Sequence, residues 1–247
     1  MTSNQFFVPR LEEGASLIVL RGEEHRHLAK AARVRPGDSV WLFDADGRRC
    51  LAEVVSVGRE RSELRALRRE GPEGRRVSLA LVQAMLQAKK MEFLVQKAAE
   101  LGCAEFSPVI TERSLREAVD RSGRKLERWT KIAFEATKQS KGALATVVRA
   151  PRALKAYLRD PGPGRKLLLS ERGGRPLKDI LADRKTPPGP EAPSVSLLIG
   201  PEGGWSVAEE GLARESGFEA ASLGHRILKA ETAALAAAAM VLHFWGE

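Results

Sequence analysis

The first 70 residues alternate short apolar runs with turn residues, which is typical of a small antiparallel β-domain. Runs rich in valine and leucine predict strands, and turn residues such as Pro36-Gly37-Asp38 separate them. The predicted strands cover residues 17–20, 39–43, 49–57 and 62–67. Residues 23–34 lack glycine and proline and space their apolar side chains near 3.6 residues, so they predict a helix. We therefore expect a small β-barrel interrupted by one helix.

Beyond residue 74 the pattern changes to strands that alternate with helices, after a Gly- and Pro-containing linker at residues 70–74. Apolar runs predict strands at residues 77–82, 106–110, 145–148, 166–169, 195–199 and 221–223. Helical spacing predicts helices near residues 91–101, 125–140, 207–216 and 230–245. This alternation indicates an α/β domain with a mostly parallel sheet. We expect two domains, residues 1–73 and residues 74–247.

The composition excludes several classes of protein. With 43% hydrophobic and 30% charged residues, the 247-residue chain is expected to be globular rather than disordered. The chain start lacks a secretory signal pattern and no apolar run reaches the roughly 20 residues of a membrane span, so we expect a cytoplasmic protein that contacts no membrane. Cys50 and Cys103 form no CxxC, which predicts two buried reduced thiols. His25 and His27 lack a third ligand, so no metal site is expected.

The charge is unevenly distributed and favours an anionic partner. The chain has a formal net charge of +9, with 13 basic against 12 acidic residues in 1–73 and 28 against 20 in 74–247. Within the second part, residues 113–149 hold 10 basic and 4 acidic side chains, among them Arg124, Lys125 and Arg128. This segment is a candidate phosphate-contacting face, and a solvated helix surface is the alternative.

A glycine-rich turn follows the predicted strand at 195–199. The turn, Gly200-Pro201-Glu202-Gly203-Gly204, precedes a capping box, Ser206-Val207-Ala208-Glu209, which predicts the start of a helix. Ligands of α/β sheets bind at such strand ends, although a purely structural turn is the alternative. The turn matches neither GxGxxG nor a P-loop. Because the carboxylate of Glu202 would repel a polyphosphate, it suits hydroxyls, an ammonium or a sulfonium cation.

A second candidate loop, Leu223 to Lys229, leaves another strand and enters the alanine-rich helix. Its backbone groups, with Ile227 and Leu228 as apolar walls, could hold a flat heteroaromatic ring without a side-chain base. Two such turns at neighbouring strand ends predict a shared small-molecule pocket.

Five segments together resemble a known family. GPEGGW, SLGHRILKAETAALAA, LQAKKMEFLVQKAAELG and RWTKIAFEATKQS resemble, in order and spacing, the RsmE family of 16S ribosomal RNA uridine N3 methyltransferases in the SPOUT superfamily. HRHLAKAARVRPGD resembles the family's N-terminal motif, and the resemblance spans roughly residues 25–245. It implies a PUA-like β-barrel for RNA binding, followed by a SPOUT-type trefoil-knotted α/β domain that binds S-adenosylmethionine, and a homodimer.

The resemblance also implies which residues bind the cofactor. The family's site corresponds to two loops and a third wall: Gly200, Glu202 and Gly203; Leu223, Gly224, Ile227 and Leu228; and Leu169, Ser170 and Glu171. The sequence departs from the family pattern at Lys229 and Lys141, where arginine is common, and at Asn4 and Gln5, near which an arginine is often found. Lysine keeps the charge but lacks the planar fork of arginine.

The implied reaction is methylation of a uridine N3 in 16S ribosomal RNA, free or within the small ribosomal subunit. The base must be unpaired and the N3 proton must leave. Arg226 is the candidate for stabilising negative charge on the uracil oxygens, and Gln139 or His225 for orienting the base. Arg33 and Arg35 are candidate RNA contacts of the barrel. Two rivals remain, a non-catalytic RNA-binding protein and a SPOUT methyltransferase that acts on transfer RNA.

Overall fold

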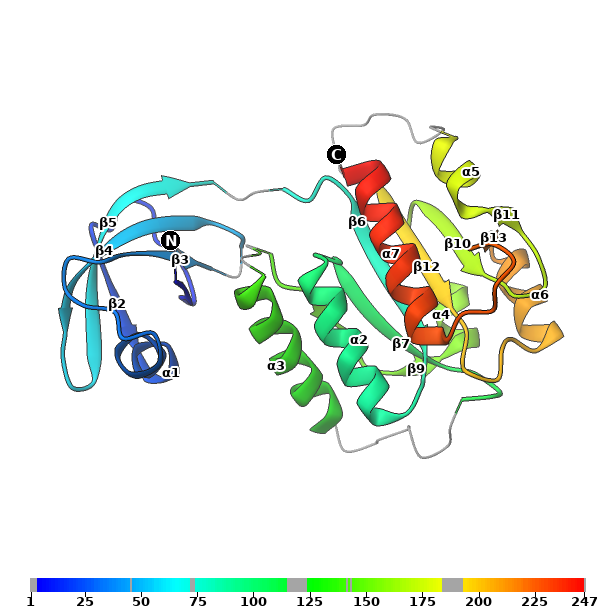
Figure 1. Ribbon diagram of the computed structural model, residues 1–247, viewed down its shortest axis with the longest axis horizontal. Helices are drawn as coiled ribbons and strands as arrows, with labels where there is room; N and C mark the ends of the chain where they lie inside the picture. Colours follow the sequence, from blue (N-terminus) through cyan, green and yellow to red (C-terminus); the bar gives the residue numbers. More distant parts are fainter. Residues whose placement is uncertain are drawn as a thin grey trace. The chain divides into compact units, whose positions relative to one another are not determined.

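The computed structural model describes residues 4–44, 46–71, 74–114, 124–140, 142, 144–183 and 193–246. The chain divides into two compact units (Figure 1). The first comprises Met1–Gly74 with Thr137–Ala145, and the second comprises Arg75–Ala136 with Thr146–Glu247. A small β-unit therefore precedes an α/β unit, which confirms the expected fold class.

The N-terminal unit contains a five-stranded sheet in the order β1-β3-β4-β5-β2. Its strands are β1 (Gln5–Phe7), β2 (Leu17–Arg21), β3 (Ser39–Phe43), β4 (Arg49–Val57) and β5 (Arg61–Glu70). All pairs are antiparallel except β1 with β3. The four longer strands were predicted, whereas β1 was missed because three residues are too few to show an alternating pattern.

The helix predicted at residues 23–34 is shorter and less regular than expected. It consists of α1 (Gly22–Arg26) followed by one π-helical turn, η1 (His27–Ala31). The wider turn is visible in the Ala32 N–H bond to the His27 carbonyl, 2.9 Å long. Arg33 then adopts a left-handed backbone with φ 52°, which ends the helix. Pro36 also disfavours helical backbone in the residue before it.

The C-terminal unit is built on an eight-stranded sheet in which every described pairing is parallel, as predicted. The main order is β11-β13-β10-β12-β6-β7-β8, and β9 pairs with β7. The strands are β6 (Ser78–Ala84), β7 (Glu105–Ile110), β8 (Val147–Val148), β9 (Arg152–Ala153), β10 (Arg165–Leu169), β11 (Arg175–Pro176), β12 (Ser194–Ile199) and β13 (Glu219–Ser222).

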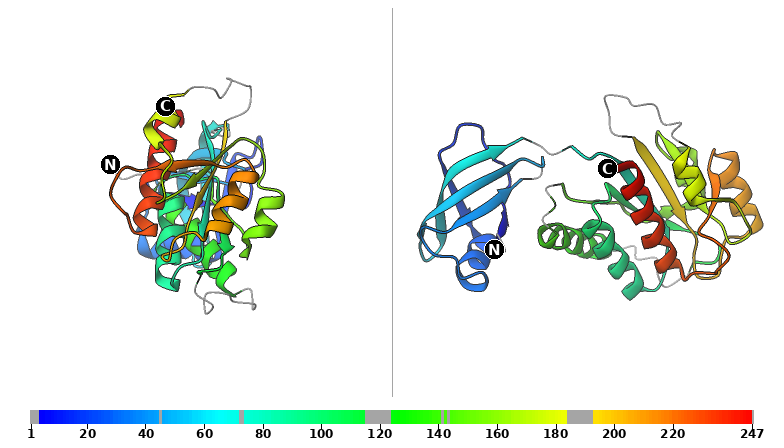
Figure 2. Two further views of the ribbon diagram at one scale, coloured as in Figure 1. Left: turned by 90° about the vertical axis from the view of Figure 1, so that its right-hand side faces the viewer. Right: turned by 45° about the horizontal axis from the view of Figure 1, so that its top comes forward.

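Helices cover both faces of this sheet. They are α2 (Ala88–Glu100), α3 (Arg124–Gln139), α4 (Leu154–Arg159), α5 (Leu177–Ala182), α6 (Val207–Glu215) and α7 (Ala230–Gly246). Buried residues of α2, α3, α5 and α7 share one core cluster, and those of α4 and α6 share another. Figure 2 shows α2 and α7 on one side of the sheet and α6 on the other. The short helices α4 and α5 were not predicted.

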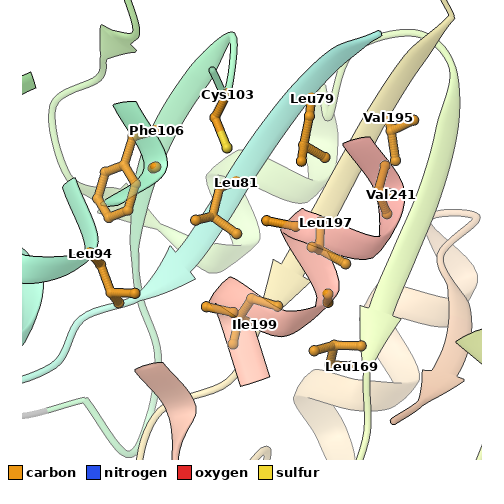
Figure 3. Close-up of a cluster of buried hydrophobic side chains, with 14 of the residues drawn as sticks. Leu79, Leu81, Leu94, Cys103, Phe106, Leu169, Val195, Leu197, Ile199 and Val241 are labelled. Carbon is orange, nitrogen blue, oxygen red and sulfur yellow. The ribbon is translucent and has the colours of Figure 1, made fainter. Parts of the chain in front are cut away.

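The core explains why the apolar runs of β6 and β12 are continuous. Leu79 and Leu81 of β6 pack with Leu197 of β12 and Val241 of α7 on one face (Figure 3). Val82 of β6 packs in the cluster on the other face. A strand buried on both faces needs apolar residues at consecutive positions. Among the described residues, no helix is long and apolar enough to cross a membrane.

The two cysteines are free and fully buried, as predicted. Burial raises the pKa of the Cys103 thiol to about 12 and also raises that of Cys50. Because the thiolate is the reactive form, we expect neither thiol of the native protein to react with a chromogenic disulfide reagent at pH 8. Both should react in guanidinium. Rapid modification of Cys103 in the native protein would show that this core is open.

Candidate functional site

The described residues form a cavity of about 650 Å³ in the C-terminal unit, at one edge of the sheet. The adjacent parallel strands β13, β10 and β12 all end there. We name the segments after them loop A (170–174, after β10), loop B (200–205, after β12) and loop C (223–229, after β13). Parallel strands bring such loops together at their carboxyl ends, where α/β proteins bind ligands. The volume lies within the usual range for small-molecule pockets.

The cavity gathers all the residues that the sequence resemblance assigned to a cofactor. These lining residues are Leu169, Ser170, Glu171, Gly200, Glu202, Gly203, Leu223, Gly224, Ile227 and Leu228. His225 and Arg226 of loop C also line it. Gln139 does not, because it is an exposed residue at the end of α3 in the segment assigned to the N-terminal unit. The fold therefore brings the predicted cofactor residues, His225 and Arg226 to one cavity, and the role of each residue stays a prediction.

Trp205 connects loop B to the end of β10. Its indole Nε1 donates a 2.9 Å hydrogen bond to the Leu169 carbonyl, and the side chain is buried. In return, Nη2 of Arg172 in loop A donates a 2.9 Å bond to the Trp205 carbonyl. Two hydrogen bonds in opposite directions therefore fix the separation of the two loops.

Glu210 of α6 lies beneath the same two loops and is 6% exposed. Its carboxylate accepts a 2.8 Å bond from Ser170 Oγ and a 2.9 Å bond from Arg214 Nη2, and Arg172 lies 3.6 Å away. A buried carboxylate is costly unless it is paired and hydrogen-bonded. Since the partners of Glu210 come from loop A and from α6, its burial holds loop A against that helix.

Lys90 of α2 joins loop B to the start of α7. Its Nζ lies 2.7 Å from Glu202 and 3.3 Å from Glu231. The bond to Glu202 raises the pKa of Lys90 above its usual value, so the ammonium stays charged at neutral pH. Burial opposes ionisation of Glu231, but its own backbone N–H and Lys90 outweigh that effect and lower its pKa. The negative charge of Glu202 is therefore already paired with the Lys90 ammonium within the protein.

Two further side chains, Gln83 and Arg113, donate hydrogen bonds to backbone carbonyls of loop B. The fully buried Gln83 donates from Nε2 to the Gly200 carbonyl at 3.2 Å, and Arg113 Nη1 donates to the Gly203 carbonyl at 2.8 Å. The predicted capping box is confirmed, because Ser206 and Glu209 exchange side-chain to backbone bonds of 3.2 Å.

Several polar residues of this site were not assigned to it from the sequence, among them Lys90, Arg113, Arg172 and Glu210. Lys90 lies within one of the segments that carry the family resemblance, which was its only signal. The others had no local signal, because the contacts that bring them to the site join residues 33 to 90 positions apart along the chain.

The predicted RNA contacts are on the surface but differ in their electrostatic setting. Arg33 and Arg35 are exposed in the N-terminal unit, and Arg124 is exposed at the start of α3. Arg128 forms a two-pronged ion pair with Glu92, with N···O distances of 2.7 and 2.8 Å. Because that carboxylate already neutralises Arg128, the helix surface is less positive there than the sequence indicates.

Comparison with known proteins covers both units. A family described as "RNA methyltransferase domain" matches residues 73–242, and one described as "RNA methyltransferase PUA domain" matches residues 20–67. Ribosomal RNA small subunit methyltransferase E of Synechocystis sp. is 30% identical over 91% of this chain and 72% of its own length. The Mycobacterium bovis protein of that name is 28% identical over 96% and 90%.

A solved structure is similar over nearly the whole chain. It is the ribosomal RNA small subunit methyltransferase E of Neisseria gonorrhoeae bound to S-adenosyl methionine, with 32% identity and a TM-score of 0.86. The match covers 99% of this chain and 98% of that one. Both units therefore have the fold of that protein.

Gly204 is the residue of loop B whose backbone conformation favours glycine. Gly204 has φ +67°, whereas no positive φ occurs at Gly203, where an added Cβ would meet Arg113 atoms at 3.4 Å, an ordinary contact. Gly204→Ala should therefore lower the free energy of unfolding by about 1–2 kcal/mol, the cost of a left-handed non-glycine residue. Gly203→Ala is the matched control and should be nearly neutral. Equal losses in urea unfolding would contradict this assignment.

Proposed function

The chain belongs to the RNA methyltransferase family of the ribosomal RNA small subunit methyltransferases E, and we propose that it methylates N3 of a uridine in 16S ribosomal RNA with S-adenosylmethionine as methyl donor. The observation that carries the proposal is the cavity at the carboxyl ends of β10, β12 and β13, where all ten predicted cofactor residues meet. We expect it to act in the cytoplasm, on RNA that is free or within the small ribosomal subunit.

The residues of the cavity suit S-adenosylmethionine, which supplies a methyl group on a positively charged sulfur when it is bound. Ile227 is 80% exposed although it lines the cavity, so it offers an uncovered apolar surface to a flat ring. Glu171 and Glu202 both line the cavity, and because Glu202 is paired with Lys90, Glu171 is the carboxylate that favours a cation over a polyphosphate. Backbone groups of loops A, B and C would supply the remaining polar contacts.

The side chains of the chain have three tasks in this reaction. They must exclude water, align N3 with the methyl group, and stabilise the negative charge left on the uracil when its N3 proton departs. Arg226 is exposed in loop C and lines the cavity, which supports our proposal that it attracts the uracil oxygens. His225 beside it is the candidate for orienting the base, because Gln139, the other candidate, does not line the cavity.

RNA binding is assigned to both units. We propose that residues 1–73 form a PUA-like domain that positions the RNA through Arg33 and Arg35. Residues 74–247 form the SPOUT methyltransferase domain, with the knot that the resemblance implies, and supply attraction through Arg124 and Lys125. Arg128 contributes less because of Glu92. Phosphate contacts position a nucleic acid without selecting its sequence. We further propose that the protein acts as a homodimer.

Methylation assays separate this proposal from its two rivals. Purified protein should transfer a labelled methyl group to 16S ribosomal RNA or small subunits from a strain that lacks the modification, and nuclease digestion with mass spectrometry should find 3-methyluridine. Transfer RNA should stay unlabelled. Labelled transfer RNA would favour the tRNA methyltransferase, and RNA binding without S-adenosylmethionine binding in a calorimeter would favour the non-catalytic protein.

Ile227 provides a selective test of whether the cavity binds S-adenosylmethionine. Ile227→Ala should weaken S-adenosylmethionine binding at least tenfold, because it removes three carbons from the apolar contact and the loss of even one methylene there costs roughly 1–3 kcal/mol. Stability should hardly change at so exposed a position. Val207→Ala is the matched control, since Val207 is 77% exposed and does not line the cavity. Equal calorimetric affinities of the two variants would remove Ile227 from the site.

A further inference from the structure

Most of the charge at the cavity is already balanced within the protein. Lys90 is shared between Glu202 and Glu231, and Arg172 lies beside the buried Glu210. These groups brace the loops, and each cation faces a carboxylate at 3.6 Å or less.

Arg113 differs from these braced cations. It lines the cavity and its side chain is exposed, yet it forms no ion pair with any residue that the structure describes. Its hydrogen bond is to a neutral group, the carbonyl of Gly203, at 2.8 Å. A guanidinium has five N–H donors in one plane. One of them is used here, so the positive charge and most of the donors stay available to an anion.

The position of Arg113 is nevertheless well fixed. It belongs to a turn after β7 in which the Thr111 N–H bonds to Ser114 Oγ at 3.1 Å. The neighbouring Glu112 N–H donates to the Glu209 carboxylate at 2.7 Å, at the capping box of α6. With the bond to Gly203, this turn is attached to loop B and to the helix that follows it. An anion bound by Arg113 is thereby placed relative to the cofactor loop.

We propose that Arg113 is a positioning residue that binds a backbone phosphate of the RNA beside the target uridine, an inference that rests on the proposed function. An exposed guanidinium at the rim of a cavity suits a polyanion that covers the opening, and arginine grips phosphate oxygens in pairs. Because Arg113 is bonded to loop B, the bound phosphate sets the register of the uridine over the methyl group. Misplacement of about 1 Å can cost roughly 100-fold in rate.

The test compares Arg113→Ala, Arg113→Lys and a control, Arg159→Ala, which removes an exposed arginine of α4 outside the cavity. Affinity for 16S ribosomal RNA is measured against salt, S-adenosylmethionine affinity by calorimetry, and methylation rates on the same RNA or subunits. Arg113→Ala should make the log–log salt dependence shallower by about 0.7 and lower kcat/KM roughly 100-fold. Arg113→Lys should restore the salt slope but only part of the rate, because it lacks the planar fork.

Arg113→Ala also removes the hydrogen bond to the Gly203 carbonyl, so its S-adenosylmethionine affinity should fall by no more than about tenfold, the cost of one hydrogen bond. Arg159→Ala should change nothing. An unchanged salt slope for Arg113→Ala would overturn the proposal and leave Arg113 as a brace of loop B. A loss of S-adenosylmethionine affinity far beyond tenfold would also overturn it and place Arg113 in the cofactor site. Since wild-type methylation is measured in parallel, failure of the proposed function would be recognised separately.

Discussion

The site depends on one geometric constraint, the parallel direction of three neighbouring strands. β13, β10 and β12 run side by side, so their carboxyl ends meet at one edge and deliver three loops to one cavity. Geometry alone would leave these loops loosely placed. The Trp205 bond to Leu169 and the buried carboxylate of Glu210 fix loops A and B, while Lys90 connects loop B to the helix after loop C. A pocket held in this way needs little ordering when a ligand binds.

The same contacts explain a division among the charges. Glu210 can be buried because three groups surround it, and its role is structural. Arg113, Arg226 and Lys229 are exposed at the cavity and form no ion pair among the described residues, so they are cations that a substrate can meet. Removing a charge from water is costly, whereas an exposed cation keeps its long-range attraction for RNA. The sequence shows the number of charges but not this separation.

Features with a local signal were predictable. The capping box at Ser206 and the apolar strand β12 each follow from residues within a few positions. The elements that were missed are short, such as β1 and α4, or irregular, such as the π-helical turn at His27–Ala31. In each case too few residues were available for a period to show.

The loops of the candidate site could be predicted because they have local sequence signals, whereas the long-range contacts that hold them could not. Its loops could be located from the glycine turns and the family resemblance, and the cavity contains every residue assigned to the cofactor. The contacts that hold the loops could not be located. Glu202 is 112 residues from Lys90, and Ser170 is 40 residues from Glu210. Only the fold brings such pairs together.

The central claim is that loops A, B and C form one preassembled S-adenosylmethionine site. Hydrogen–deuterium exchange with and without the cofactor tests it most directly. Because the loops are braced in advance, exchange should already be slow without cofactor at the backbone amides of Ser170 and Gly204, which donate to Ala221 and Pro201. Addition of S-adenosylmethionine should slow it further in residues 170–174, 200–205 and 223–229, and leave β1 to β5 unchanged. Protection confined to other segments, or no protection at saturating cofactor, would contradict the account.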